Sequence, residues 1–67
     1  MREIVVNGAE RRVAAGQTVM GLLRELELEP ARVAVELNRR IVKRAEWETL
    51  EIESGARLEI VQFVGGG

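Results

Sequence analysis

The sequence predicts a protein of the α+β class in which a mixed β-sheet curls around a single helix. The chain has 67 residues, which is enough for one small core and leaves no room for a core together with a deep catalytic cleft. One segment has the apolar spacing of a helix, whereas the segments on both sides of it alternate with the two-residue period of strands. Because only one helix is available to cover four or five strands, the sheet is expected to wrap around it.

The N-terminal residues predict a β-hairpin. Ile4 and Val6 fall on the same face of a first strand. Asn7-Gly8 then supplies the two positive φ angles that a tight type I′ turn requires. A second strand is expected over about residues 10–14, where it pairs with the first.

The only helix is expected to begin directly after Thr18. The hydroxyl of Thr18 can accept a hydrogen bond from a free amide of the first turn and so cap the helix. The residues that follow place an apolar stripe along one side of the helix: Val19, Leu22, Leu23 and Leu26. The helix is expected to end at Glu29-Pro30, because proline disfavours helical geometry in the residue before it.

The second half of the chain predicts three more strands. Residues 33–37 alternate between apolar and more polar side chains, a turn at residues 38–40 leads into the short apolar pair Ile41-Val42, and residues 57–64 show the clearest strand pattern. The irregular segment before the last strand contributes further expected core residues: Trp47, Leu50 and Ile52. The resulting order of strand, strand, helix, strand, short strand and strand is typical of the β-grasp arrangement.

The composition excludes most kinds of active site. The chain contains no Cys and no His, so it lacks a thiolate nucleophile, the commonest general base and the usual zinc ligands. The remaining candidates are weak: Ser54 precedes a glycine in an expected turn, and the glutamates between residues 46 and 53 lack the spacing of a calcium-binding loop. We therefore expect no enzymatic activity in the chain by itself, and no catalytic residue, metal site or bound cofactor.

The charge balance is close to neutral, with ten Lys and Arg against eleven Glu and a net charge of −1. This balance provides no overall basic field for nucleic acid or an anionic membrane, and no apolar run approaches the about 20 residues of a transmembrane helix. A soluble cytoplasmic protein is therefore expected, with neither nucleic acid nor membrane as a partner. One local basic cluster either meets an acidic partner or balances nearby glutamates: Arg39, Arg40, Lys43 and Arg44.

Three glycines follow the last strand: Gly65, Gly66 and Gly67. Such a tail spans about 10 Å when extended, and without side chains it can pass through a narrow channel to a distant active site. Glycine loses the most backbone entropy in an ordered position, so three in succession favour a use for a slim tail; an inert terminus is the alternative. The chain is accordingly divided into a β-grasp domain, residues 1–64, and a flexible C-terminal tail, residues 65–67.

The strand before the tail is expected to expose an apolar strip. Glu59 shares a face of this strand with Val61 and Phe63, opposite the face of Leu58 and Ile60. A glutamate is rarely buried without a partner, so the Glu59 face is expected to point outward. An exposed strip that leads toward the tail is where a partner protein is expected to bind; a bulge that turns Phe63 inward is the alternative.

Four groups of residues form a combined pattern along essentially the whole chain: Ala14-Ala15-Gly16-Gln17-Thr18-Val19 with Leu22-Leu23; Val33-Ala34-Val35-Glu36-Leu37-Asn38 with Ile41-Val42 and Arg44; Trp47; and Leu58-Glu59-Ile60-Val61 with Phe63-Val64-Gly65-Gly66-Gly67. This pattern resembles the bacterial sulfur carriers of thiamine (thiazole) biosynthesis, a family of ubiquitin-like β-grasp proteins. Relatives often carry Gly-Asp before the last strand, where this chain has Gly55-Ala56. That position is an expected turn, so the departure has little bearing on the implied chemistry.

The resemblance implies a reaction at the C-terminal carboxylate of Gly67. An E1-like adenylyltransferase would use ATP and Mg²⁺ to convert this carboxylate to an acyl-adenylate. Sulfur that a cysteine desulfurase derives from cysteine would displace AMP and leave a thiocarboxylate, which thiazole synthase would use as its sulfur donor. Gly65 and Gly66 would thread the channel of each partner, and three residues would contact the partners: Val61, Phe63 and Val64.

Other functions remain open for a chain with this C-terminus. The sulfur carrier of molybdenum cofactor synthesis shares the Gly-Gly end but is typically longer and lacks the central Asn-x-x-Ile-Val and Trp pattern. A ubiquitin-like modifier would join its C-terminal glycine to lysines of target proteins, although the single lysine of this chain, Lys43, leaves little for building chains. A β-grasp interaction module with an inert tail is a third alternative.

Overall fold

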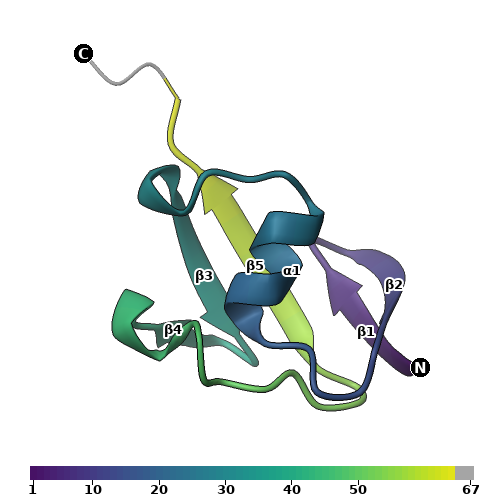
Figure 1. The fold of residues 1–67 in the computed structure, drawn as a ribbon. Helices are drawn as coiled ribbons and strands as arrows, with labels where there is room; N and C mark the ends of the chain where they lie inside the picture. Colours follow the sequence, from purple (N-terminus) through teal and green to yellow (C-terminus); the bar gives the residue numbers. More distant parts are fainter. Residues whose placement is uncertain (65–67) are drawn as a thin grey trace.

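The computed structural model describes residues 1–64 and contains a five-stranded mixed sheet with one α-helix across one of its faces (Figure 1). The elements are β1 (Arg2–Val6), β2 (Ala9–Val13), α1 (Val19–Glu25), the 3₁₀-helix η1 (Pro30–Arg32), β3 (Val33–Leu37), β4 (Arg40–Val42), the 3₁₀-helix η2 (Arg44–Glu46) and β5 (Arg57–Gln62). The strands lie in the spatial order β2-β1-β5-β3-β4. Strands β1 and β5 pair in parallel, and the other neighbours pair antiparallel. The predicted α+β class and β-grasp arrangement are therefore confirmed.

Both hairpins of the sheet close through two-residue turns with positive φ angles. Asn7 (φ 50°) and Gly8 (φ 83°) join β1 to β2 as predicted, and Asn38 (φ 49°) and Arg39 (φ 70°) join β3 to β4. The second turn is one residue shorter than expected, because Arg40 already pairs with β3. Turns of this kind match the twist of the strands that they connect, so each hairpin pairs directly from the turn onward.

Helix α1 begins as expected. The Thr18 hydroxyl accepts a hydrogen bond from the Gly21 N–H at 3.0 Å and caps the first turn. Two further amides of this turn donate to carbonyl oxygens of the segment between β4 and β5: Val19 to Leu50 at 3.0 Å, and Met20 to Trp47 at 2.8 Å. The irregular segment therefore satisfies backbone groups that the helix itself leaves free.

The expected end of the helix at Pro30 is wrong. Helix α1 ends at Glu25, and Glu27 adopts a left-handed conformation with φ 58°. Two hydrogen bonds close the last turn in a Schellman motif: Glu27 N–H to Arg24 O at 3.0 Å, and Leu28 N–H to Leu23 O at 2.9 Å. The helix has thus ended before the proline, which instead begins η1.

The core lies between α1 and the inner face of the sheet. Thirteen apolar side chains are buried there: Ile4, Val13, Val19, Leu22, Leu23, Val33, Val35, Val42, Trp47, Ile52, Ala56, Leu58 and Ile60. Trp47 and Ile52 were predicted core residues, whereas Leu50 is only partly buried against the core. The Trp47 indole N–H donates to Val42 O at 3.0 Å, so this side chain also ties the irregular segment to β4. Within residues 1–64, no polar or charged residue is buried.

Candidate functional site

Strand β5 is the central strand and carries the chain toward its C-terminal end. It leaves the sheet at the end opposite the N-terminus (Figure 1), and it ends at Gln62 rather than at residue 64 as expected. The Phe63 N–H still donates to Arg32 O at 2.7 Å, so the chain is held beside β3 as far as Phe63. Val64 follows and is 91% exposed. The predicted tail residues lie outside the described residues: Gly65, Gly66 and Gly67.

The turn between β1 and β2 supports this end of β5. Strand β1 ends at Val6, yet the Asn7 side chain continues the pairing with β5. Its amide group donates to Ile60 O at 3.1 Å, and its oxygen accepts from the Ile60 N–H at 2.7 Å. The sequence pattern identified Asn7 only as a turn residue, because its partner lies 53 positions away.

The expected apolar strip is present on the outer face of β5, which faces away from α1. This strand buries Leu58 and Ile60, as predicted. Val61 is 57% exposed and Phe63 is 55% exposed, so the alternative in which Phe63 turns inward is wrong. We call the exposed apolar residues beside the end of β5 the exit strip: Val61, Phe63 and Val64. Contact between the exit strip and a partner protein stays a prediction.

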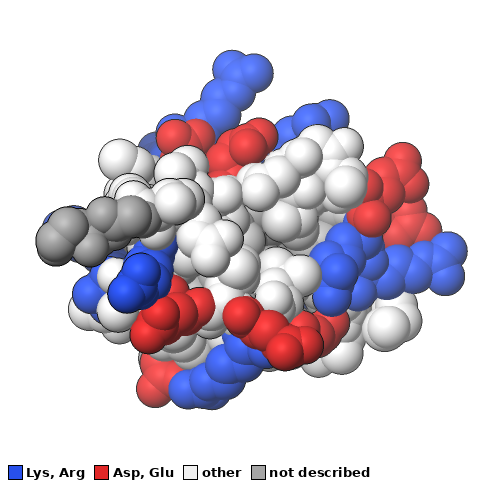
Figure 2. Space-filling model, turned by 90° about the horizontal axis from the view of Figure 1, so that it is seen from above, with Lys and Arg blue, Asp and Glu red and all other residues white. Residues whose placement is uncertain are grey.

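The surface around the end of β5 is poor in charged side chains. Figure 2 looks onto the end of the molecule where β5 finishes and shows a broad uncharged area with acidic and basic groups at its margins. Helix η1 contributes Pro30 and Ala31 next to Arg32 at this end. Depletion of charged side chains from the centre of a surface is a common feature of protein-binding surfaces.

The outer face continues from β5 across β3 to β4. A shallow hollow is lined by residues of these three strands: Ala34, Val35, Glu36, Ile41, Glu59 and Val61. Ile41 is 79% exposed, and the sequence pattern gave no sign of this. Glu36 and Glu59 are direct cross-strand partners, and neither belongs to an ion pair within residues 1–64. Two unneutralised carboxylates therefore interrupt the apolar surface.

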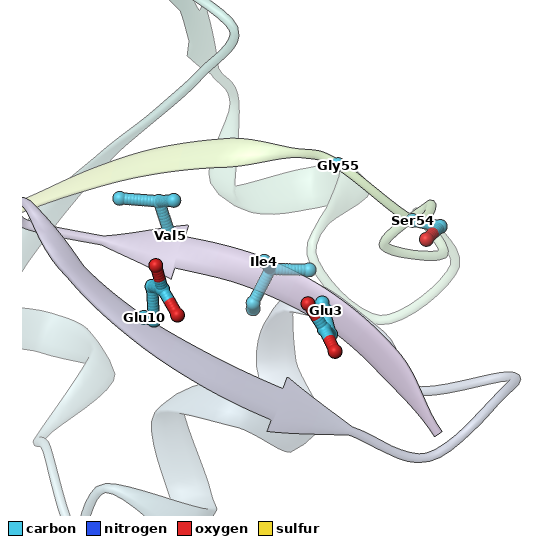
Figure 3. A pocket seen from close by; sticks show the side chains of 6 residues that line it. All are labelled: Glu3, Ile4, Val5, Glu10, Ser54 and Gly55. Atoms are coloured by element: carbon cyan, nitrogen blue, oxygen red, sulfur yellow. The ribbon is translucent and has the colours of Figure 1, made fainter.

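A second hollow lies where β1 and β2 meet the turn before β5. It is lined by Glu3, Ile4, Val5, Glu10, Ser54 and Gly55 (Figure 3). Gly55 has φ 85° and donates its N–H to Glu3 O at 2.7 Å, so Ser54-Gly55 acts as the turn that the sequence predicted. In the described part of the chain, no group of three or more metal-ligating side chains occurs, and no helix is long and apolar enough to cross a membrane.

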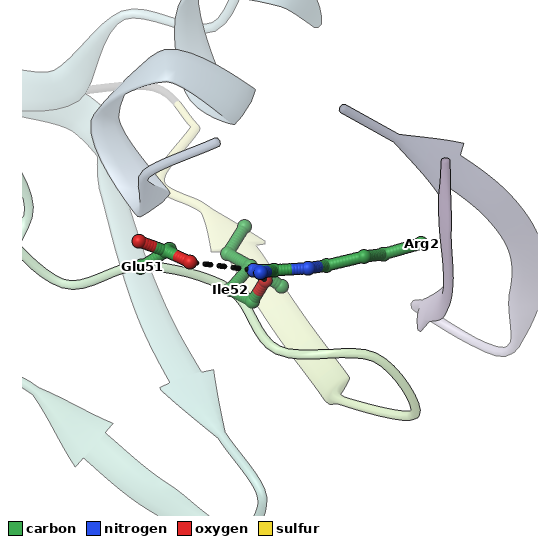
Figure 4. A network of polar contacts seen from close by, with 3 residues as sticks. All are labelled: Arg2, Glu51 and Ile52. Carbon is green, nitrogen blue, oxygen red and sulfur yellow. Dashed lines mark hydrogen bonds and ion pairs between the residues drawn. The ribbon is translucent and has the colours of Figure 1, made fainter. Parts of the chain in front are cut away.

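Two of the glutamates between residues 46 and 53 bind arginines from other elements. Glu51 accepts from the Arg2 guanidinium at 2.7 Å, and the same nitrogen donates to Ile52 O at 2.9 Å (Figure 4). Glu48 pairs with Arg24 at 3.0 Å. These partly exposed contacts tie the irregular segment to β1 and α1, and each contributes modestly to stability.

The chain is similar to known proteins along its whole length. A model of the family described as the ThiS family matches residues 1–67. The chain is 34% identical over 65 residues to the sulfur carrier protein ThiS of Escherichia coli strain K12, in a match that covers 97% of this chain and 98% of that protein. It is also 43% identical over 65 residues to a thiazole synthase of Paramagnetospirillum magneticum and 37% identical to one of Magnetococcus marinus. These two matches cover 97% of this chain, which spans only 20% of the length of each thiazole synthase.

Two solved structures share the fold. The crystal structure of the thiamine biosynthesis protein ThiS from Geobacter metallireducens superposes with a TM-score of 0.82 at 31% sequence identity, over 97% of this chain and 99% of that chain. A solution NMR structure of a thiamine biosynthesis protein from the same organism gives a TM-score of 0.75 at 31% identity, over 97% of this chain and 87% of that chain. The β-grasp arrangement predicted from the sequence is thus the arrangement found in these proteins.

Proposed function

Because the chain belongs to the ThiS family, we propose that it is a sulfur carrier protein of thiamine biosynthesis and carries sulfur as a thiocarboxylate on Gly67. The observation that supports this proposal most directly is the position of the exit strip. The central strand of the sheet presents Val61 to solvent, the exposed Phe63 and Val64 follow it, and in the sequence the three glycines come next. A partner enzyme that binds the exit strip would receive the tail at the same time.

The proposed reaction has two steps, both catalysed by partner enzymes. A carboxylate is a poor electrophile, so an E1-like adenylyltransferase first uses ATP and Mg²⁺: a carboxylate oxygen of Gly67 attacks the α-phosphorus, and pyrophosphate leaves. A desulfurase takes sulfur from cysteine as a persulfide on its own thiol, and a thiol reductant, which is oxidised to a disulfide, releases this sulfur as hydrosulfide. The hydrosulfide then forms a C–S bond at the carbonyl carbon as the C–O bond to AMP breaks. ATP and Mg²⁺ are bound by the adenylating enzyme in this proposal, and the carrier holds no cofactor.

The chain itself contributes the carboxylate, the reach of the tail and a docking surface. Three extended glycines span about 10 Å, which allows the carboxylate to enter an active site below the surface of the partner. The chain has no Cys, so no thiol of its own competes for the acyl-adenylate. In this proposal the protein is a co-substrate of its partners rather than an enzyme, and it works in the cytoplasm.

We propose thiazole synthase as the enzyme that receives the sulfur. The thiazole synthases of Paramagnetospirillum magneticum and Magnetococcus marinus each contain a region similar to 97% of this chain. The presence of a region similar to this chain within thiazole synthases supports the proposal that the chain and thiazole synthase take part in the same reaction. The adenylating enzyme and the desulfurase are required by the chemistry, because the carboxylate must be activated and the sulfur must be supplied.

Intact mass spectrometry tests the proposed function. The chain is incubated with the adenylating enzyme, ATP, Mg²⁺, cysteine, the desulfurase and a thiol reductant, and the expected product is heavier by the replacement of one oxygen with one sulfur. The chain without Gly67 is the matched control and is expected to stay unmodified. Attachment to lysines of other proteins would support a ubiquitin-like modifier, and conversion only by enzymes of molybdenum cofactor synthesis would support that carrier. An unchanged mass would contradict the proposal.

A further inference from the structure

The ten basic residues of the chain fall into two groups according to their ion pairs. All ten lie within residues 1–64. Each of the five in the first half of the chain pairs with a glutamate: Arg2, Arg11, Arg12, Arg24 and Arg32. The other five belong to no ion pair in the described part of the chain: Arg39, Arg40, Lys43, Arg44 and Arg57. The charges of the second group are therefore not neutralised by direct contact with a carboxylate there.

The unpaired group gathers around the β3–β4 hairpin. Residues 39–44 supply four of its members from the turn, β4 and the start of η2. Arg57 joins them from β5, because its carbonyl oxygen accepts a hydrogen bond from the Asn38 N–H at 2.8 Å. All five side chains belong to exposed residues, so their charges are available to a binding partner.

Ile41 lies in the middle of this group without a role in packing. The other members of the central sequence motif make internal contacts: Asn38 Oδ1 accepts from the Arg57 N–H at 3.0 Å, Val42 is buried, the Arg44 guanidinium lies 5.5 Å from the centre of the Trp47 ring, and Trp47 donates to Val42 O. The Ile41 side chain is instead largely exposed. An exposed isoleucine in a segment with three unpaired cations at residues 39, 40 and 43 is not explained by the stability of the fold.

We propose that this region docks onto an acidic surface of one of the enzymes that act on the C-terminal carboxylate. We call it the β4 surface: Arg39, Arg40, Ile41, Lys43 and Arg57. The inference rests on the proposed function, because it assigns the partner from that reaction. An apolar centre with a charged rim is the usual composition of a protein interface. Unpaired cations at the rim attract an acidic patch and speed the encounter of the two proteins.

The β4 surface lies beside the exit strip, and the hollow that they share also contains the carboxylates of Glu36 and Glu59. Ile41 and Val61 line the same hollow on the outer face of the sheet, with Ala34 between them on β3. The pairing of β3 with both β4 and β5 fixes this arrangement. One partner enzyme can therefore cover the apolar strip beside the tail and the basic rim at the sheet edge with a single interface.

The positions of the carboxylates favour a protein partner over nucleic acid. Glu46 lines a hollow together with Arg40, and Glu36 and Glu59 line the neighbouring hollow with Ile41. These carboxylates would repel a continuous phosphate backbone, which binds through many successive cations. A protein surface can instead place acidic side chains against the cations and its own basic side chains against Glu36 and Glu59.

Charge reversal at the β4 surface tests the inference. The variant Arg40→Glu/Lys43→Glu removes two of its cations, and the control Arg12→Glu/Arg24→Glu makes the same change in net charge on β2 and α1. Each protein is checked for folding by the fluorescence of Trp47 and is titrated against the adenylating enzyme and thiazole synthase at low and high salt. We expect the β4 variant to bind at least one enzyme about tenfold more weakly at low salt, with a smaller salt dependence. The control is expected to bind both within about twofold of the unmodified chain.

A second variant tests the apolar centre without a change in charge. Ile41→Ser is expected to weaken binding to the same enzyme several-fold, because it removes an apolar side chain from the middle of the interface. Equal binding by both β4 variants, the control and the unmodified chain would overturn the inference. Preferential binding of a DNA or RNA oligonucleotide, or a dimer of the chain that the β4 variants abolish, would also overturn it.

The proposed function is measured separately in the same samples. Conversion of the unmodified chain to the thiocarboxylate, together with equal binding by all variants, would mean that the docking inference fails while the proposed function stands. An unmodified chain that is neither converted nor bound by the enzymes would contradict both.

Discussion

The side-chain amide of Asn7 makes two hydrogen bonds with the backbone of Ile60, as an acceptor at 2.7 Å and as a donor at 3.1 Å. These bonds hold the centre of β5 beyond the point where the backbone of β1 has ended. In the variant Asn7→Gly, glycine readily adopts the φ angle of 50° that the turn requires. The variant nevertheless leaves the Ile60 N–H and C=O without these partners. We expect the free energy of unfolding, measured by urea denaturation, to fall by about 1–3 kcal/mol.

The matched control is Asn38→Gly. Asn38 occupies the same position in the other two-residue turn, with φ 49°, and its side chain accepts one exposed hydrogen bond from the Arg57 N–H. We expect a smaller loss of stability than for Asn7→Gly. Equal losses would show that both asparagines act only through their turns, contrary to a specific role of Asn7 in holding β5.

Glu27 ends helix α1 in a conformation that suits glycine. With φ 58°, its Cβ is strained by about 1 kcal/mol, and its side chain is exposed. We expect Glu27→Gly to raise the free energy of unfolding by about 1 kcal/mol, as measured by thermal denaturation. Arg24→Gly, within the helix, is expected to lower it by about 1 kcal/mol. A loss of stability in both variants would show that the Glu27 side chain contributes more than its strain costs.

The parts of the fold that depend on neighbouring residues were predictable from the sequence, and those that depend on distant segments were not. The Asn7-Gly8 turn and the Thr18 cap require only residues a few positions away, so their local patterns sufficed. The end of the helix depends on Glu27, and a glutamate gives no signal for a left-handed conformation, which glycine or asparagine usually supplies. Pro30 is the only residue of this segment with a sequence signal for a helix end, although it lies beyond the actual end of α1 and begins η1.

Some features of the candidate site were likewise predictable from the sequence, and others were not. Exposure of Val61 and Phe63 was predictable because Glu59 marks the outer face of their strand. Exposure of Ile41 follows from the register between β3 and β4, and a strand of three residues is too short to show a periodicity. The basic cluster at residues 39–44 was predictable from the sequence. Ion-pair partners come from distant segments, as Arg2 and Glu51 do, so only the structure shows that this cluster is unpaired within residues 1–64 and that Arg57 joins it.

Phe63 is expected to serve binding rather than stability. Because its side chain is more than half exposed, Phe63→Glu is expected to change the free energy of unfolding by no more than about 0.5 kcal/mol. The same variant places a charge on the exit strip, and we expect binding to the adenylating enzyme to weaken about tenfold or more, as measured by calorimetry. Ser54→Glu adds the same charge in the turn before β5 and is expected to bind normally. An unfolded Phe63→Glu variant would place Phe63 in the core, and normal binding would remove it from the interface.

Deletion of Gly67 is expected to abolish adenylation without destabilising the fold. The thirteen buried core side chains lie between Ile4 and Ile60, so the free energy of unfolding is expected to change by less than about 0.5 kcal/mol. The deletion withdraws the carboxylate by about 3.5 Å of extended chain, which leaves it short of the α-phosphate of the ATP bound by the partner. We expect release of pyrophosphate to be lost, whereas Gly67→Ala, which keeps the length and adds one methyl group, is expected to retain measurable release. Adenylation of the shortened chain at the normal rate would contradict a mechanism that depends on the position of this one carboxylate.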